Sequence, residues 1–189
     1  MGRDPLEMIA AQIKGGADVI QLREKNMPKG EKLPLGLATR NLTKQEGTLF
    51  IVNDDLDLAL ILEADGVHLG QDDIPIQYAR PLMKDKIIGI STHSLDQARE
   101  AIDSGADYIG IGPAFKTETK AKTDPVVGVD LMLKVQELSS IPVIAIGGIG
   151  ESNIDILLNK GIKKVAIISD ILSSRDIEAK TRALKEKLM

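Results

Sequence analysis

Residues 50–73 read FIVNDDLDLALILEADGVHLGQDD and indicate how the whole chain is built. The apolar run Phe50–Val52 is followed by a helical pattern, Leu56–Leu62, and then by a second apolar run, Val67–Leu69. This order predicts a strand, a helix and a second strand parallel to the first, because neighbouring parallel strands need such a crossover. The crossover is expected to be right-handed, and both strands then end at the same edge of the sheet.

An acidic turn follows each of these two strands. Residues 53–55 (NDD) come after the first strand and residues 70–73 (GQDD) after the second. Because the strands end at one edge, Asp54 and Asp73 are expected to lie together, where two carboxylates would suit Mg²⁺ and its preference for oxygen ligands. The alternative is that Asp54 or Asp55 only caps the helix that follows it, and that Asp73 only caps the next helix.

Composition restricts the class of protein. The chain has 189 residues, 43% hydrophobic and 28% charged, which is ordinary for one soluble globular domain spanning residues 1–189. A net charge of -4 without a basic stripe argues against a nucleic-acid partner. The absence of cysteine excludes disulfides, zinc thiolates and cysteine nucleophiles. No apolar run approaches the roughly 18 residues of a membrane span, and the start does not read as a signal peptide, so a cytoplasmic protein is expected.

The rest of the chain repeats the same alternation of helix and strand. Further helices are expected at about residues 4–14, 34–45, 75–84, 95–104, 129–138, 151–159 and 175–188, and further strands at 19–22, 87–91, 108–111, 143–146 and 165–168. Small joints such as Gly16-Ala17-Asp18 and Gly105-Ala106-Asp107 connect a helix to the next strand, with glycine in the left-handed conformation that ends a helix.

These repeated joints and near-continuous apolar strands predict an all-parallel sheet covered by helices. The repeat interval favours an α/β fold of the (β/α)8 TIM-barrel type. A doubly wound open sheet is the alternative. It would require a glycine-rich dinucleotide turn after an early strand, and the sequence contains none there.

Polar residues or glycines follow every predicted strand at its C-terminal end. They are Gln21, Arg23, Lys25, Asn53, Asp54, Asp73, Ser91, Thr117, Thr119, Lys120, Gly147, Gly148 and Ser169. In a barrel these strand ends converge on the face that carries the active site, whereas the joints at the opposite ends consist of small residues. This asymmetry predicts an enzyme and favours a metal-binding role for Asp54 and Asp73 over helix capping.

The charges separate into two candidate anion sites. Arg23, Lys25, Lys120 and a metal ion on the two aspartates would neutralise a polyanion such as a pyrophosphate. The alternatives are surface pairing of Arg23 and Lys25 with Glu24 or Asp18, and a solvated loop around Lys120.

The second candidate site consists of Gly147-Gly148 and Ile168-Ser169, each just before a predicted helix. Exposed backbone N–H groups there would suit a monophosphate, and loops after the last two strands often bind phosphate in barrels. The alternative is two ordinary tight turns. Neither histidine is an obvious catalyst: His68 is expected in the barrel interior or at its rim, and His93 in the turn before Ser94.

Taken in order, these motifs resemble those of the thiamine-phosphate synthase family. The matching segments are QLREK (21–25), FIVND (50–54), GVHLGQDD (66–73), GIS (89–91), GP (112–113), TETK (117–120), IGGI (146–149) and IS (168–169). The resemblance implies a (β/α)8 barrel and a transferase that joins hydroxymethylpyrimidine diphosphate to hydroxyethylthiazole phosphate, giving thiamine phosphate and pyrophosphate. In the family chemistry, pyrophosphate leaves first and the thiazole nitrogen then captures a pyrimidine-methyl cation.

The resemblance also implies roles for individual residues. Asp54 and Asp73 would hold Mg²⁺. The pyrimidine diphosphate would be bound by Gln21, Arg23, Lys25, Asn53, Ser91 and Lys120, and the thiazole phosphate by Thr117, Thr119, Gly148, Ile168 and Ser169. Lys120, Arg23 and Ser91 would be the catalytic residues, because charge grows on the leaving pyrophosphate as the bond breaks.

The chain departs from the family pattern at two places. Residues 26–47 fit only loosely, and the family's first strand has no counterpart, so seven strands are counted where eight are expected. We therefore expect an N-terminally truncated chain with a gap between the strands at Val19 and Val165. Two other functions stay open: a thiazole tautomerase on the same scaffold, which needs no diphosphate or metal site, and a truncated barrel without activity. Small-molecule substrates are the expected partners, and a homo-oligomer is compatible with the sequence.

Overall fold

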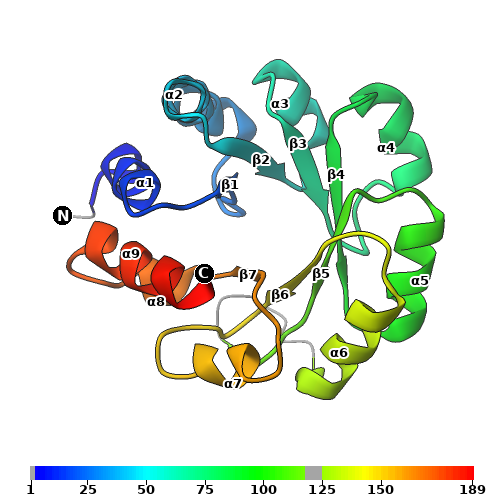
Figure 1. Cartoon of the computed structure of the whole chain (residues 1–189). Helices are drawn as coiled ribbons and strands as arrows, with labels where there is room; N and C mark the ends of the chain where they lie inside the picture. Colours follow the sequence, from blue (N-terminus) through cyan, green and yellow to red (C-terminus); the bar gives the residue numbers. More distant parts are fainter. Residues whose placement is uncertain (1–2, 118–124) are drawn as a thin grey trace.

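The computed structural model describes residues 3–117 and 125–189 and contains one parallel sheet that curls on itself. Its strands lie side by side in chain order (Figure 1): β1 (Val19–Leu22), β2 (Leu49–Asn53), β3 (Gly66–Leu69), β4 (Ile87–Thr92), β5 (Tyr108–Ile111), β6 (Val143–Ile146) and β7 (Val165–Ala166). The predicted parallel α/β architecture is confirmed as a curled half-barrel of the TIM-barrel type.

The helices cover the outer face of this sheet (Figure 1). They are α1 (Pro5–Lys14), α2 (Lys29–Glu46), α3 (Leu56–Ile61), α4 (Ile76–Met83), α5 (Leu95–Asp103), α6 (Gly128–Leu138), α7 (Ile154–Leu158), α8 (Ser169–Leu172) and α9 (Ile177–Leu188). The core is almost entirely aliphatic, as a chain with 2% aromatic residues requires. No helix in the described ranges is long and apolar enough to cross a membrane.

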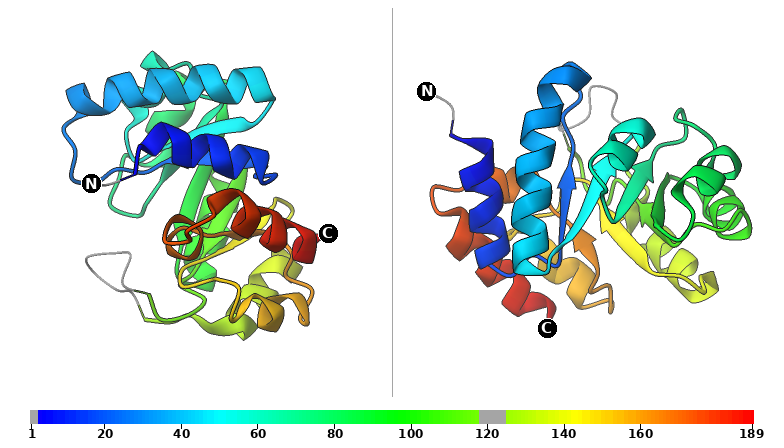
Figure 2. Two further views of the ribbon diagram at one scale, coloured as in Figure 1. Left: turned by 90° about the vertical axis from the view of Figure 1, so that its left-hand side faces the viewer. Right: turned by 90° about the horizontal axis from the view of Figure 1, so that it is seen from above.

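The sheet is open between its first and last strands. Strands β1 and β7 form its two edges, and no ladder joins them in the part of the chain that the structure describes. The expected gap between Val19 and Val165 is therefore present. Helices α1 and α9 pack against each other on this side (Figures 1 and 2). The interior strand β3 is buried throughout, whereas Val19 at the β1 edge is 46% exposed.

Aspartates hold the joints at the N-terminal ends of the strands. Asp65 Oδ2 accepts a hydrogen bond from Phe50 N at 2.8 Å and from Arg40 at 2.9 Å. Asp107 Oδ2 likewise accepts from Ile88 N at 2.7 Å and from Arg80 at 2.6 Å. Each carboxylate thus provides an acceptor for a backbone N–H of the preceding strand, a group that is costly to leave unpaired when buried.

Several element boundaries differ from those expected, and three of the differences have a clear cause in the structure. Helix α2 begins at Lys29 rather than at residue 34 and contains Pro34. The proline removes one helical hydrogen bond, but ion pairs of Lys29 and Lys32 with aspartates on the neighbouring turn hold the first turns in place. Helix α7 begins at Ile154 rather than at residue 151, because the Asn153 side chain bonds back to the preceding turn.

The third difference lies at the end of the sheet. Strand β7 stops at Ala166, not at residue 168, and an additional short helix, α8, follows from Ser169. In the sequence, Ile167-Ile168 continues the apolar run of the strand. In the structure, Ile168 leaves the sheet with φ −116° and ψ −78°, and its carbonyl accepts a hydrogen bond from Leu172 N.

Because Asp107 holds a joint at the N-terminal ends of the strands, replacing it should destabilise the fold without changing the loops at the C-terminal ends. Asp107→Ala removes the acceptor for Ile88 N and the partner of Arg80, and we expect it to lower the free energy of unfolding by about 1–2 kcal/mol. Urea denaturation measures the change, with Asp85→Ala, an exposed residue of the preceding joint, as the matched control. Equal effects of the two substitutions would contradict the capping role.

Candidate active site

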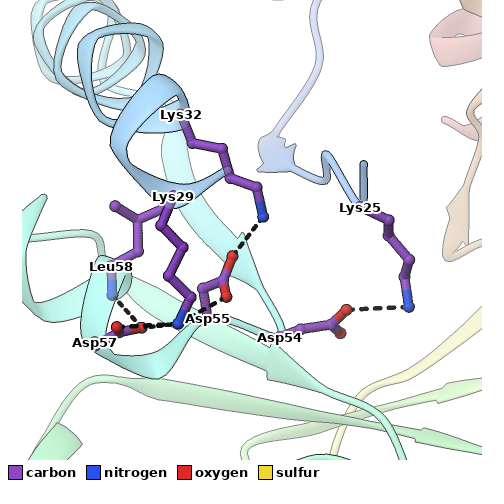
Figure 3. Close-up of polar contacts among 7 residues, drawn as sticks. All are labelled: Lys25, Lys29, Lys32, Asp54, Asp55, Asp57 and Leu58. Carbon is purple, nitrogen blue, oxygen red and sulfur yellow. Dashed lines mark hydrogen bonds and ion pairs between the residues drawn. The ribbon is translucent and has the colours of Figure 1, made fainter. Parts of the chain in front are cut away.

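Charged residues from three loops meet at the C-terminal edge of the sheet. Lys25, in the loop after β1, lies 3.0 Å from Asp54 Oδ2 after β2 (Figure 3). The carboxyl group of Asp54 lies close enough to that of Asp73 to raise its pKa. The predicted meeting of the two aspartates is confirmed, and the surface pairing of Lys25 with Glu24 or Asp18 is wrong, because Lys25 binds Asp54 and Asp18 pairs with Lys185.

The backbone of Asp54 is fixed to the neighbouring strand. Its φ of 63° lies in the left-handed region, which aspartate tolerates better than most residues. Asp54 N donates to the carbonyl of His68 at 2.8 Å, and Asp54 O accepts from Leu56 N at 3.1 Å. These bonds hold the turn so that the Asp54 carboxylate comes next to the Asp73 carboxylate.

Two lysines of α2 clamp the same turn (Figure 3). Lys32 Nζ lies 2.7 Å from Asp55 Oδ2, and Lys29 Nζ lies 3.1 Å from Asp55 Oδ1 and 2.7 Å from Asp57. Burial favours a higher pKa for Asp55, but hydrogen bonds from Lys32 and Lys29 outweigh this effect and lower that pKa. Asp55 occupies the N-cap position of α3 without a side-chain capping bond, so the capping alternative is wrong for this residue.

Asp73 is also no helix cap. Its Oδ2 accepts from Gly70 N at 2.6 Å, within its own turn, and the N-cap position of α4 belongs to Pro75. Burial is the largest effect on Asp73 and raises its pKa; the neighbouring Asp54 also raises it, while the Gly70 N–H and Lys25 oppose the change. The folded protein therefore holds a partly buried carboxyl next to a second one, an arrangement that a cation would stabilise.

This pair fits Mg²⁺. The described residues contain no group of three or more His, Cys, Asp or Glu side chains that could hold a metal. Mg²⁺ does not require one, because it usually binds one or two carboxylates together with waters and substrate phosphate oxygens. Asp54 and Asp73 would supply the carboxylates, and a diphosphate would supply the remaining charged oxygens.

A second concave region lies beside the last two loops. It is a cavity of about 660 Å³ lined by Lys116, Thr117, Gly148, Ile149, Gly150, Ser152, Asn153, Ser169, Asp170 and Ser173. Gly148 has φ 68°, and a Cβ there would lie 2.7 Å from the carbonyl oxygens of Phe115 and Lys116. Only glycine fits this position. Asn153 donates to Gly148 O at 2.8 Å and accepts from Gly150 N at 2.9 Å, which fixes the turn.

The lining of this cavity suits a small anion, because hydroxyl groups, an amide and a lysine surround it. The carboxylate of Asp170 also lines it, but this group accepts a hydrogen bond from Glu151 N at 3.1 Å and lies 3.8 Å from Lys180 Nζ. Comparison with known proteins points to the same chemistry. The family described as Thiamine monophosphate synthase matches residues 1–171. The chain belongs to this family.

Individual relatives support the assignment to the synthase family. A thiamine-phosphate synthase of Pelotomaculum thermopropionicum is 47% identical over 186 residues, which cover 98% of this chain and 85% of the relative. One of Dictyoglomus turgidum is 44% identical and covers 97% of this chain and 83% of the relative. The solved structure of a thiamine phosphate pyrophosphorylase from Pyrococcus furiosus superimposes with a TM-score of 0.91 at 38% identity, covering 98% of this chain and 90% of that chain.

The structure brings together part of the residue set that the synthase resemblance implies. Thr117, Gly148 and Ser169 line the cavity, and Ile168, 41% exposed, directly precedes Ser169. Thr119 and Lys120 lie outside the described residues. Ser152, Asn153, Ser173 and Lys116 also line the cavity and were missed by sequence reasoning. The polar pair Ser152-Asn153, directly after a glycine-rich turn, was the available signal.

The remaining implied residues lie at the other strand ends of this synthase-family fold. Gln21 lies in the last half of β1, and Arg23 directly follows the strand, two residues before Lys25. Asn53 lies opposite His68 in the β2–β3 ladder. Ser91 is buried near the end of β4, and its carbonyl accepts from Gln71 Nε2 at 2.7 Å, which joins it to the loop of Asp73.

The two lysines of the α2 clamp should differ in their effect on stability. The side chain of Lys32 is 10% exposed and that of Lys29 is 54% exposed, although both pair with Asp55. Removing a partner from a buried ion pair leaves an uncompensated charge. We expect Lys32→Ala to lower the free energy of unfolding by about 2–3 kcal/mol and Lys29→Ala by less than about 1 kcal/mol. Chemical denaturation of the two variants measures this, and similar losses would show that burial of the pair is unimportant.

Proposed function

We propose that this protein is a thiamine-phosphate synthase that condenses hydroxymethylpyrimidine diphosphate with hydroxyethylthiazole phosphate to give thiamine phosphate and pyrophosphate. The observation that carries the proposal is the pair of anion sites at one edge of the sheet: Lys25 with Asp54 and Asp73, and the cavity at Gly148. A diphosphate and a monophosphate are the two anions that this reaction brings together.

The diphosphate end is proposed to lie at the aspartate pair. Bound Mg²⁺ would neutralise charge on the diphosphate. Lys25 would exchange its partner, Asp54, for a phosphate oxygen, and Arg23 on the same loop would bind a second oxygen in the bidentate manner typical of guanidinium groups. Gln21, Asn53 and Ser91 would fix the pyrimidine and the diphosphate by hydrogen bonds.

Bond breaking then needs stabilisation of the leaving group. The bond between the pyrimidine-methyl carbon and the diphosphate oxygen breaks, and its electron pair goes to pyrophosphate. The cations around the diphosphate stabilise this growing charge, while the chain positions the thiazole nitrogen next to the methyl carbon. The nitrogen lone pair forms the new C–N bond, so no general base is needed there.

The thiazole phosphate is proposed to bind in the cavity at Gly148. Thr117, Ser152 and Ser169 offer hydroxyl donors, and Lys116 offers a positive charge. Thr119 and Ile168 complete the set implied by the family resemblance. The closeness of Phe115 O and Lys116 O to Gly148 leaves no room for a side chain, so this turn at the cavity can form only with glycine.

The aspartate pair supports a synthase over a thiazole tautomerase, because a tautomerase binds one phosphate and needs no metal or diphosphate site. The proposal covers a cytoplasmic enzyme with small-molecule substrates and makes no demand on its oligomeric state.

Turnover should depend on Mg²⁺ and on both aspartates. Asp54→Asn and Asp73→Asn are each expected to reduce kcat/KM by at least ~100-fold, while Asp72→Asn, an exposed neighbour, should leave it unchanged. The assay mixes both substrates and measures pyrophosphate with and without chelator. Full wild-type turnover in excess chelator would contradict the metal assignment.

The thermal stability of Asp73→Asn shows whether its loss of activity comes from the metal site or from unfolding. The pKa of Asp73 is raised in the folded protein, so its ionisation lowers stability as the pH rises from the unfolded pKa to the folded pKa, and the loss is complete above the folded pKa. Asp73→Asn removes this charge. We therefore expect its melting temperature in chelator at neutral pH to equal or exceed that of the wild type, and a markedly lower value would indicate a structural defect instead.

Lys120→Ala tests the role implied for the loop lysine. If Lys120 stabilises charge on the leaving pyrophosphate, the substitution should slow single-turnover chemistry more than it weakens thiazole phosphate binding. Rapid-quench kinetics and direct binding measurements separate the two effects. A loss confined to thiazole phosphate affinity would place Lys120 at the other site.

A further inference from the structure

A histidine and a tyrosine meet inside the curled sheet by reaching across the strand between them. His68 on β3 pairs in register with Gly89 on β4, and Gly89 pairs with Tyr108 on β5. A Cβ on Gly89 would lie 2.0 Å from the Tyr108 ring, so the ring lies directly over this glycine. The His68 and Tyr108 rings are stacked, with centroids 5.4 Å apart.

These residues form a hydrogen-bonded row that ends at Ser91. His68 Nδ1 lies 2.8 Å from the Tyr108 hydroxyl, and His68 Nε2 lies 2.8 Å from Ser91 Oγ. His68 is 7% exposed and Ser91 8%. Both ring nitrogens of the buried His68 therefore have a hydroxyl partner. These partners determine which nitrogen carries the proton and donates a hydrogen bond.

The direction of the hydrogen bonds follows from Tyr108. Burial raises the pKa of its hydroxyl, so the O–H stays protonated and needs an acceptor. Among the described residues, His68 Nδ1 is the acceptor within reach. If Nδ1 accepts, the proton of the neutral imidazole lies on Nε2 and is donated to Ser91 Oγ. The Ser91 hydroxyl then accepts from His68, and its own O–H can donate a hydrogen bond to another group.

We propose that His68 and Tyr108 are positioning residues that hold Ser91 as a hydrogen-bond donor toward the diphosphate substrate. This inference rests on the proposed function, which assigns Ser91 to that substrate. Diphosphate oxygens only accept hydrogen bonds, so a serine beside them must donate. With the opposite tautomer, Ser91 would donate to His68 and turn its lone pairs toward the anion, which is repulsive.

The tautomer can be observed directly by NMR. The chain contains two histidines, and a His93→Gln variant assigns their signals. In ¹⁵N-histidine-labelled protein at a pH where both rings are neutral, the nitrogen shifts of His68 should show a proton on Nε2. Tyr108→Phe removes the hydroxyl and should shift the ring toward a mixture of tautomers. A proton on Nδ1 in the wild type, or no change in Tyr108→Phe, would overturn the proposal.

Kinetics tests whether the row acts through Ser91. Tyr108→Phe should lower kcat by ~10-fold to ~100-fold, as is typical when a supporting partner is removed, with little change in KM for thiazole phosphate. In a Ser91→Ala background the same substitution should have almost no further effect. An equal loss in both backgrounds would mean that Tyr108 acts only on the fold, and would overturn the proposal.

Two variants of His68 keep the test decisive if Tyr108→Phe does not fold. His68→Gln retains an acceptor for Tyr108 and an N–H donor for Ser91, whereas His68→Leu retains neither. The proposal expects kcat to be at least ~10-fold higher for His68→Gln than for His68→Leu. Equal kcat values for the two variants would overturn it. Absence of synthase turnover in the wild type would instead overturn the proposed function, and the NMR result would still decide the tautomer.

Discussion

A parallel sheet places the starts of all its strands at one edge, and the N–H groups exposed there need acceptors. In this protein Asp65 and Asp107 supply acceptors for Phe50 N on β2 and Ile88 N on β4, and each aspartate is in turn held by an arginine from a covering helix. At these two joints, small residues and a single aspartate are enough to provide the acceptor. The loops at the other edge are therefore free of that structural task and can carry charged and polar groups.

The charges at the second edge are arranged so that repulsion is only partly relieved. Asp55 is neutralised by two lysines, and its pKa is lowered. Within residues 3–117 and 125–189, Lys25 is the cation recorded beside Asp54 and Asp73, and the pKa of Asp73 is raised. Neighbouring acidic residues thus differ: Asp55 stabilises the turn through its lysines, whereas Asp54 and Asp73 keep a repulsion that the proposed metal ion would relieve.

Much of the fold and part of the site could be predicted from sequence for a specific reason. Apolar runs and helix–glycine–aspartate joints are local signals, and a parallel order then forces Asp54 and Asp73 to the same edge. Features that depend on contacts between distant elements could not be predicted. Helix α2 starts early because its lysines bind the turn of Asp55, and the His68–Tyr108 contact requires a glycine on the strand between them.

The cavity at Gly148 shows the same limit. Thr117, Gly148 and Ser169 were expected there because each follows a strand, but Ser152 and Ser173 follow no strand directly. Ser152 reaches the cavity because Asn153 folds the turn after Gly148, and Ser173 because α8 interrupts the chain after β7. Neither the hydrogen bonds of the Asn153 side chain nor helix α8 could be predicted from the order of the strands alone.

The open side of the sheet has a consequence for the order of folding. Helix α1 packs on α9, and Lys185 pairs with Asp18 across a separation of 167 residues along the chain. Contacts so distant in sequence close the longest loops and form late. During synthesis on the ribosome, β1 to β7 can assemble one unit after another, while the outer side of β1 stays uncovered. Helix α9, which packs on α1 at this side, leaves the exit tunnel after all seven strands, so a nascent chain is vulnerable to aggregation until α9 has emerged.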